Sequence, residues 1–349
     1  MAIGPVVGGV LLAHFGWDSI FLVNLPLTAV ALIAGRWLVP ASRSAVARRL
    51  DPAGAFASVA AFTLLTWALI AAPASGWLSA ATTARLAGGV ACLVALVLIE
   101  IRSDHPMLPL PVFRNRRLAG AATALLLLFF ALSGAVFLTT QIYQVVLGYS
   151  PLAAGLRALP PAVTLAAAAA AGAHLAKRAG ARAPVAGGLA LVSAGLAFFA
   201  TATAASSYTH YVLAMVMVSA GIGLAMSAAT TLTMEQLPPA LAGVGSAVND
   251  ATRNLGSVLG VAVVGSVTAS VFASRMAGHG AADSSVSAVM AAAHRTGGAH
   301  GGELLHTAAI AFVAGADHGV MIAAVVTLAG AIVALVTLRK SKTGQAEPA

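Results

Sequence analysis

The chain has 349 residues, of which 60% are hydrophobic and 8% are charged, whereas an ordinary soluble domain carries about 25% charged residues. Its formal net charge is +9, but the basic residues are spread between hydrophobic runs and form no patch that would bind nucleic acid. The single cysteine, Cys92, has no partner for an intrachain disulfide. The composition excludes a soluble domain and a nucleic-acid-binding protein, and it predicts an integral membrane protein embedded in the lipid bilayer.

Charge-free runs long enough to cross a hydrocarbon core of about 30 Å recur along almost the whole chain. A backbone in lipid must satisfy its hydrogen bonds within helices or closed barrels, and strand alternation is absent, so we expect helices. The sequence predicts ten spans, near residues 2–15, 20–38, 53–72, 84–101, 119–143, 153–175, 184–204, 210–233, 251–272 and 318–338.

The basic residues give these spans a direction. If the ten spans alternate, the 19 lysines and arginines fall on one side of the membrane except Arg85, Arg157, Arg275 and Arg295. Short cytoplasmic loops hold an excess of Lys and Arg. We therefore expect a multi-pass protein of the plasma membrane whose first span runs outward and whose carboxyl terminus is cytoplasmic.

The first predicted span is short. A helix from Met1 to Phe15 covers only about 22 Å at 1.5 Å per residue, which is less than the hydrocarbon core. The sequence therefore predicts that Met1 is an internal residue of a longer protein.

Several stretches resemble one family. "GPVVGG", followed by "FGW", "IF" and "NLP", is similar to the fifth helix and the following turn of drug and proton antiporters of the major facilitator superfamily, in the branch with fourteen spans. "LDPAGA", "HPMLPLPVFRNRRLAGA", "QIYQVVLGYSPLAAGLRALP" and "AGVGSAVNDATRNLGSVLGVAVVGSV" are similar to later stretches in the same order. The resemblance implies an all-α major facilitator fold that holds spans 5 to 14 of 14.

The resemblance also implies a division of the chain. Residues 1–39 would be the last two helices of an amino-terminal six-helix bundle, 40–117 two linker helices with cytoplasmic loops, and 118–349 a complete carboxy-terminal bundle. An outer segment at about 273–316 is predicted as a flexible loop with a short helix around "GELLHTAAIAFVAG". The spacing of its histidines does not fit a metal site, so no metal is expected.

Gly4 and Gly8 lie four residues apart, beside Pro5 and Gly9, and present a small-residue face that another helix can approach closely. A general packing face would look the same. The resemblance implies that this antiporter-like glycine helix seals the interface between the two halves against ion leakage. Gly256 and Gly260 form a corresponding face on a span of the same direction.

The turn after the sixth span resembles the family's cytoplasmic loop signature at Lys177, Arg178, Gly180 and Arg182. Ala173 stands where the signature has glycine, and Lys177 stands where it has aspartate. A basic loop that only sets the topology is therefore the favoured interpretation.

Polar residues at membrane depth are candidates for a transport pathway, because they are costly unless they face a cavity or a partner. The Gln and Tyr residues near 141–144 either line a central cavity or cap their helix at the interface. Asp250 and Arg253, at i and i+3, favour a structural ion pair. The candidate pathway or gating residues are Asn24, Gln141, Tyr143, Gln144, Asn249, Asp250 and Arg253.

The resemblance implies proton-coupled efflux of hydrophobic or amphipathic drugs and antibiotics by a monomer that alternates access, with no cofactor besides the proton gradient. The spans present hold no convincing buried carboxylate, and the family's coupling acid often lies in a first span that is absent here. A non-transporting remnant and an exporter of another small metabolite remain alternatives. No His-Glu-x-x-His, Gly-x-Ser-x-Gly or glycine-rich phosphate loop occurs, so we expect no enzyme and no catalytic residues.

Overall fold

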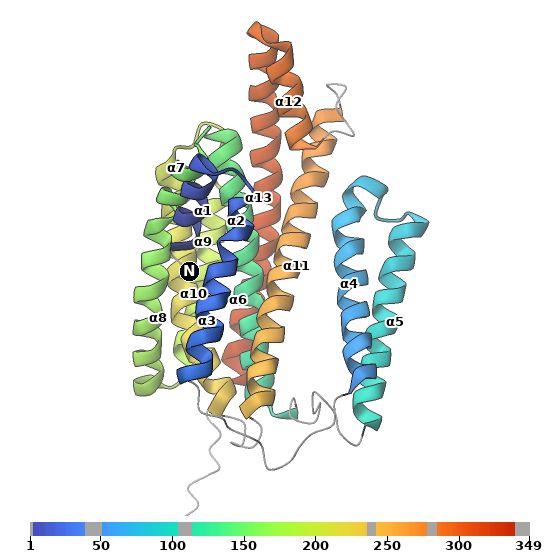
Figure 1. Cartoon of the computed structure of the whole chain (residues 1–349), viewed down its shortest axis with the longest axis vertical. Helices are drawn as coiled ribbons and strands as arrows, with labels where there is room; N and C mark the ends of the chain where they lie inside the picture. The colour runs from blue at the N-terminus through green and yellow to red at the C-terminus, as the bar shows by residue number, and fades with distance from the viewer. Residues whose placement is uncertain (1–2, 39–50, 104–113, 236–241, 278–284, 339–349) are drawn as a thin grey trace, which may run out of the picture.

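The computed structural model describes residues 3–38, 51–103, 114–235, 242–277 and 285–338. Every regular element within these ranges is a helix (Figure 1). The elements are α1 (Ile3–His14), α2 (Ser19–Leu22), α3 (Asn24–Leu38), α4 (Pro52–Ser75), α5 (Ala80–Arg102), α6 (Arg116–Gln141), the π-helical turn η2 (Ile142–Val146), α7 (Pro151–Arg157), α8 (Leu159–Ala179), α9 (Arg182–Phe199), α10 (Tyr208–Glu235), α11 (Ala242–Met276), α12 (Val286–Thr296) and α13 (Gly298–Thr337).

Nine helices within the described residues are long and apolar enough to cross a membrane. They coincide with the predicted spans from residue 20 onward, so the prediction of an all-α polytopic membrane protein is confirmed. The remaining predicted span, the first in the chain, is α1, which is helical but has only 12 residues. At 1.5 Å per residue α1 is about 18 Å long, which is shorter than the hydrocarbon core.

Within the outer segment at about 273–316, the predicted helix around "GELLHTAAIAFVAG" is present as part of α13, but the prediction of a flexible loop was wrong for most of the other described residues. Helix α11 continues to Met276, α12 packs against α13, and α13 is one helix of 40 residues. Helices α12 and α13 extend beyond the other helices at the top of Figure 1. Gly315 and Gly319 lie within α13 and do not interrupt it. They let α13 approach α11 closely, since a Cβ on Gly315 would lie 2.6 Å from the Thr268 carbonyl oxygen.

The carboxy-terminal bundle is built from α6, α8, α9, α10, α11 and α13. Helix α10 packs between α8 and α9, while α11 packs along α6 and α13. Small residues bring these helices together, as is usual in membranes, where lipid removes the hydrophobic drive between helices. At Gly223, for example, a Cβ would lie 2.7 Å from the Cβ of Ala168 on α8. The bundle is therefore tightly packed around a continuous apolar core that includes Leu125, Leu189 and Ile222.

The remaining helices are attached to this bundle at few points. Helices α4 and α5 pack mainly on each other, and the Ser266 hydroxyl of α11 donates a hydrogen bond of 2.7 Å to the Leu69 carbonyl of α4. Helix α1 packs on α7. Helix α3 buries none of its residues.

Successive long helices run in opposite directions, so their loops gather at two ends of the molecule (Figure 1). The lower end in that view holds the basic ends of α3, α5 and α8 and the basic starts of α6 and α9. The described basic residues of these helix ends are Arg36, Arg102, Arg116, Arg117, Lys177, Arg178 and Arg182. The basic residues of these helix ends thus lie at one end of the molecule, as the predicted alternation of span directions requires.

Candidate functional site

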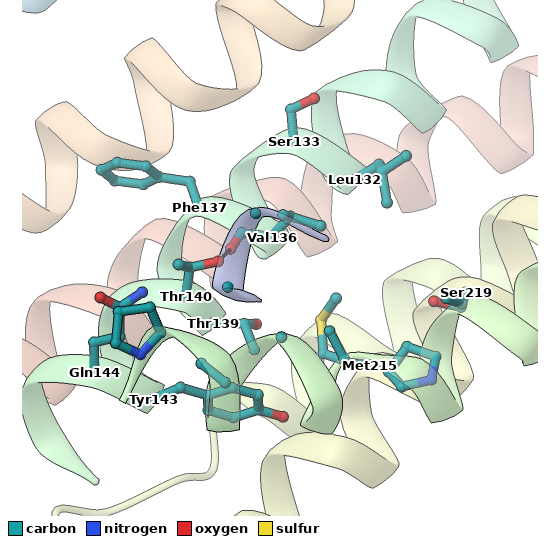
Figure 2. Close-up of a pocket in the computed structure, with 18 of the residues that line it drawn as sticks. Leu132, Ser133, Val136, Phe137, Thr139, Thr140, Tyr143, Gln144, Met215 and Ser219 are labelled. Atoms are coloured by element: carbon teal, nitrogen blue, oxygen red, sulfur yellow. Dashed lines mark hydrogen bonds between the residues drawn. The ribbon is translucent and has the colours of Figure 1, made fainter. Parts of the chain in front are cut away.

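A cavity of about 700 Å³ lies where α1 faces the carboxy-terminal bundle, and Figure 2 shows it from close by. Its wall comes from α1, α6, η2, α7, α8, α10 and α11. The volume falls in the range of about 300 to 1,000 Å³ that is typical of small-molecule sites. Apolar side chains such as Leu132, Phe137, Leu165 and Met215 form most of the wall.

The polar groups of the wall are all uncharged at neutral pH. None of the described residues that line the cavity is Asp, Glu, Lys, Arg or His. The neutral polar residues on the wall are Ser133, Thr139, Thr140, Tyr143, Gln144 and Ser219. The cavity therefore suits a mainly apolar molecule that carries a few hydrogen-bonding groups.

The end of α6 determines where Tyr143 and Gln144 lie. The α-helix changes at Ile142 into the five-residue π-helical turn η2, and such turns are frequent at functional sites. The chain then turns through Gly148, whose φ of +66° favours glycine. A backbone hydrogen bond of 2.9 Å from the Tyr149 N–H to the Tyr143 carbonyl closes this turn. The local geometry thus holds Tyr143 on the cavity wall, as the lining interpretation expects.

Two buried hydroxyls of the wall lack a hydrogen-bond partner in the structure. Thr139 is 7% exposed and Tyr143 is 2% exposed, and neither the Thr139 nor the Tyr143 hydroxyl oxygen has a partner. By contrast, the Thr140 hydroxyl donates to the Val136 carbonyl at 2.8 Å. A buried polar group without a partner costs about 1 to 3 kcal/mol. Both oxygens are themselves buried, so the rest of the wall covers them from the cavity.

A cluster of tyrosines and one arginine lies behind Tyr143. The Arg157 guanidinium sits 4.1 Å from the ring centroid of Tyr149, and the Tyr208 hydroxyl donates to the Arg157 carbonyl at 3.0 Å. The Tyr143 ring centroid lies 5.7 Å from that of Tyr208. Cation–π contact holds the arginine charge on the aromatic faces, and Arg157 does not line the cavity.

The glycines of α1 have different surroundings. A Cβ on Gly9 would lie 2.8 Å from the Leu152 Cα of α7, whereas Gly4 and Gly8 have nothing within 4 Å. Gly8 and Gly9 both line the cavity. The side chain of Pro5 lies outside the described part of the structure. Gly9 is therefore the α1 glycine that permits close contact between α1 and α7.

Gly256 and Gly260 lie where α11 crosses α6. A Cβ on Gly256 would meet the Leu126 carbonyl and Phe129, and one on Gly260 would lie 2.9 Å from the Phe130 Cα. This second-half glycine face serves packing inside the bundle and does not line the cavity.

The expected ion pair between Asp250 and Arg253 does not form, and that interpretation was wrong. Asp250 is exposed, while the Arg253 guanidinium donates to the Thr230 hydroxyl at 3.0 Å and lies 5.2 Å from the Phe129 ring centroid. The physical reason is that Arg253 faces α10 and α6, where a hydroxyl and a ring accommodate it. Asn249 is buried beside it with an unpartnered side-chain oxygen.

The other predicted polar residues lie away from the cavity. Gln141 is half-buried and does not line it, and Asn24 is exposed on α3, where its side chain donates to the Ile20 carbonyl at 3.2 Å. Asn249, Asp250 and Arg253 do not line the cavity either. Of the predicted pathway residues, the structure brings only Tyr143 and Gln144 to its wall.

The basic turn predicted after the sixth span lies between α8 and α9. Lys177 and Arg178 occupy the last turn of α8, and Arg182 begins α9. Gly180 caps α8 with a φ of +81°, a conformation that L side chains rarely adopt. Its N–H donates to the Ala176 carbonyl at 2.9 Å.

Sequence reasoning missed Thr139, Arg157, Tyr149 and Tyr208. Thr139 had a usable signal, because it precedes Tyr143 by four residues and so shares its helix face. The other three were not predictable from spacing, since the turn at Gly148 and the start of α10 bring them together only in the folded bundle.

Comparison with known proteins agrees with this architecture. The Major Facilitator Superfamily profile matches residues 1–261. The multidrug resistance protein Stp of Mycobacterium tuberculosis is 35% identical over 79% of this chain and 51% of its own length. The multidrug efflux pump LfrA of Mycolicibacterium smegmatis is 32% identical over 97% of the chain and 69% of its own length.

The tetracenomycin C resistance and export protein of Streptomyces glaucescens is 30% identical over 99% of this chain and 67% of its own length. The chain thus spans about half the length of Stp and about two thirds of the other two relatives. The family match covers well over half of the chain, and the same region forms the helices that surround the cavity. This chain belongs to the Major Facilitator Superfamily.

Proposed function

We propose that the chain is part of a membrane transporter that exports hydrophobic or amphipathic compounds, including drugs and antibiotics. The observation that carries the proposal is the mainly apolar, uncharged cavity of about 700 Å³ between α1 and the bundle. The relatives named for multidrug resistance, multidrug efflux and antibiotic export support the same class of cargo. The proposal makes the protein a transporter rather than an enzyme, acting as a monomer in the plasma membrane with its carboxyl terminus in the cytoplasm.

We propose that access to the cavity alternates at the contact between α1 and α7. In transporters of this fold, rocking of one half against the other exposes a central site to each side in turn. Here α1 touches α7 through Gly9, at the upper end of the molecule in Figure 1. Separation of α1 from α7 would open the cavity at that end, and renewed contact would close it.

We propose the proton gradient as the energy source, with no cofactor. A proton can drive the cycle only if it binds one of the two conformations more tightly than the other. The described wall of the cavity holds no carboxylate. The proton would therefore bind away from this wall, so that cargo and proton need not compete for the same side chains.

An efflux assay tests the proposal. Cells that express the chain are loaded with a hydrophobic fluorescent dye, and dye retention is followed with and without a proton uncoupler. We expect lower retention than in control cells, and the uncoupler should abolish the difference. Equal retention in both cell lines would overturn export, and efflux that resists the uncoupler would overturn proton coupling.

One pair of variants links the assay to the structure. Gly9→Val should slow efflux, because its side chain would push α1 away from α7. Gly35→Val is the matched control, since Gly35 lies on α3 with nothing within 4 Å. Equal rates for the two variants would show that contact between α1 and α7 does not control access.

A remnant that transports nothing is the second candidate, because α3 buries no residue and the chain spans about half of Stp. The two candidates separate when the chain is expressed alone and together with any coding sequence that lies in frame before Met1. Efflux only from the longer product would identify this chain as a part that needs its other half.

A further inference from the structure

We propose that Asp317 of α13 is a proton-binding site, at which a proton taken up from the outer side of the membrane weakens cargo binding in the cavity. The proposal rests on the proposed export and proton coupling, and it names the residue through which the proton would act. The sequence gives no such signal, because the predicted last span begins at residue 318, directly after Asp317. In the structure α13 begins at Gly298, so Asp317 lies well inside a continuous helix.

Asp317 has different surroundings from the other described acids of the carboxy-terminal bundle. Glu235, Asp250 and Glu303 are exposed, whereas Asp317 is half-buried. Its Oδ1 atom is buried without a hydrogen-bond partner, while Oδ2 has no partner either but is not buried. One oxygen thus stays open to a water-sized molecule. A charge in such a place is costly without an opposite charge, and a proton bound to Oδ2 removes that charge.

The length of α13 places Asp317 at the outer edge of the membrane. About 30 Å of helix rise separates Asp317 from Thr337, where α13 ends, and this equals the thickness of the hydrocarbon core. The carboxyl end of α13 points to the lower, basic end of the molecule in Figure 1. With that end in the cytoplasm, Asp317 lies where protons of the outer side can reach it.

Few ionisable groups face Asp317. Arg275 on α11 and the adjacent His318 act on its charge, and Asp317 in turn acts on Tyr211 of α10. Arg275 and His318 are exposed, and neither forms an ion pair with Asp317. Apart from Tyr143 in η2, the other ionisable residues on helices that pack on α13, and on α13 itself, lie toward the lower end of the molecule or in the outer extension: Arg116, Arg117, Arg182, Asp250, Arg253, His294, Arg295, His300, Glu303 and His306.

Tyr211 links Asp317 to a helix that forms the cavity wall. Tyr211 is fully buried, and its hydroxyl has no hydrogen-bond partner. It lies one helical turn before Met215, which lines the cavity. Because the carboxylate charge acts on Tyr211, neutralising Asp317 changes the forces on α10 beside the cavity. A proton at Asp317 can therefore favour one conformation of the transporter over the other.

A binding measurement tests the proposal without any transport step. The purified chain in lipid nanodiscs is titrated with Nile red, a neutral fluorescent dye, at about pH 8 and at about pH 5. Signal from nanodiscs without protein is subtracted. We expect Nile red to bind at least about fivefold more weakly at the lower pH, because coupling between two sites is usually of this size or larger. Infrared spectra of the same samples follow the protonation of carboxyl groups directly.

Asp317→Asn removes the proton site and keeps the shape of the side chain. Since Asn imitates the protonated carboxyl, this variant should bind Nile red at both pH values as weakly as the unaltered chain does at the lower pH. On acidification it should gain less of the protonated-carboxyl infrared band than the unaltered chain gains. The matched controls are Glu303→Gln, at an exposed acid of the same helix, and His318→Gln, at the neighbouring histidine. Both controls should keep the pH dependence.

The proposal is overturned if Asp317→Asn keeps the pH dependence of Nile red binding, if either control abolishes it, or if Asp317→Asn and the unaltered chain gain the same carboxyl bands. The infrared comparison decides whether Asp317 binds a proton even if the dye does not bind. The proposed export fails separately: proton binding at Asp317 without efflux would refute export by this chain alone. Efflux that keeps its sensitivity to the uncoupler in Asp317→Asn would refute the role of Asp317 alone.

Discussion

Two spans of nearly equal hydropathy have opposite surroundings in this protein. The segment Ser19–Leu38, which contains α3, has a mean hydropathy of 1.6 and none of it is buried, while α9 (Arg182–Phe199) has a mean hydropathy of 1.5 and is 56% buried. Hydropathy therefore predicts which segments can enter a bilayer, but it does not predict which helices pack together once they are there.

The placement of small and polar residues explains the difference. On α9, a Cβ on Gly188 would meet the Gly221 carbonyl and lie 2.7 Å from the Ala225 Cβ, so the two helices touch closely. The Ser193 hydroxyl of α9 donates to the Ala324 carbonyl of α13 at 2.8 Å. On α3, Gly35 has nothing within 4 Å. Close packing in lipid depends on such small residues and interhelical hydrogen bonds.

The largest effect is expected where a side chain is forced into the contact between α9 and α10. Gly188→Leu should lower the free energy of unfolding by about 3 kcal/mol, because the contact has no room for a Cβ. Gly187→Leu is the matched control, since the neighbouring Gly187 is exposed with nothing within 4 Å. Unfolding of the purified variants in detergent measures both. Equal losses would mean that helix propensity, and not close packing, decides the result.

A somewhat smaller effect is expected when a buried side chain is shortened. Leu189 on α9 is 0% exposed and Leu32 on α3 is 70% exposed. Leu189→Ala should cost about 2 kcal/mol through the cavity it leaves, while Leu32→Ala should stay within about 0.5 kcal/mol. The same unfolding measurement compares them. A cost at Leu32 as large as at Leu189 would show that α3 is packed against a partner.

Much of the fold was predictable because the signals are local. Long apolar runs predict the spans, and Gly180 with Lys177 and Arg178 predicts the basic turn, since helix ends and positive φ depend on neighbouring residues. For Tyr143 the sequence left cavity lining and helix capping open, because the π-helical turn after Gln141 that brings it to the wall has no signal in the residue pattern.

The remaining features depend on contacts between helices that are distant in sequence. Arg253 bonds Thr230 on α10 instead of Asp250 on its own helix, and only the packed bundle decides between these partners. Gly315 and Gly319 look like helix breakers in the sequence, yet they serve the contact between α13 and α11. Thr139 lies on the cavity wall only because α6 packs into the bundle, which the residue pattern alone does not show.

The smallest effects should come from single interhelical hydrogen bonds, and they test whether the bundle and its attached helices unfold together. Ser193→Ala breaks the bond between α9 and α13, so it should cost about 1 kcal/mol, the usual size for such bonds in membranes. Ser266→Ala breaks the bond from α11 to Leu69 of α4. Because α4 packs mainly on α5, this change should leave bundle unfolding nearly unchanged and raise hydrogen exchange in α4 about fivefold. If Ser266→Ala lowered the free energy of unfolding of the bundle as much as Ser193→Ala, then α4 and α5 would be part of the bundle's cooperative unit, and the contrast between packed and attached helices would hold only for α1 to α3.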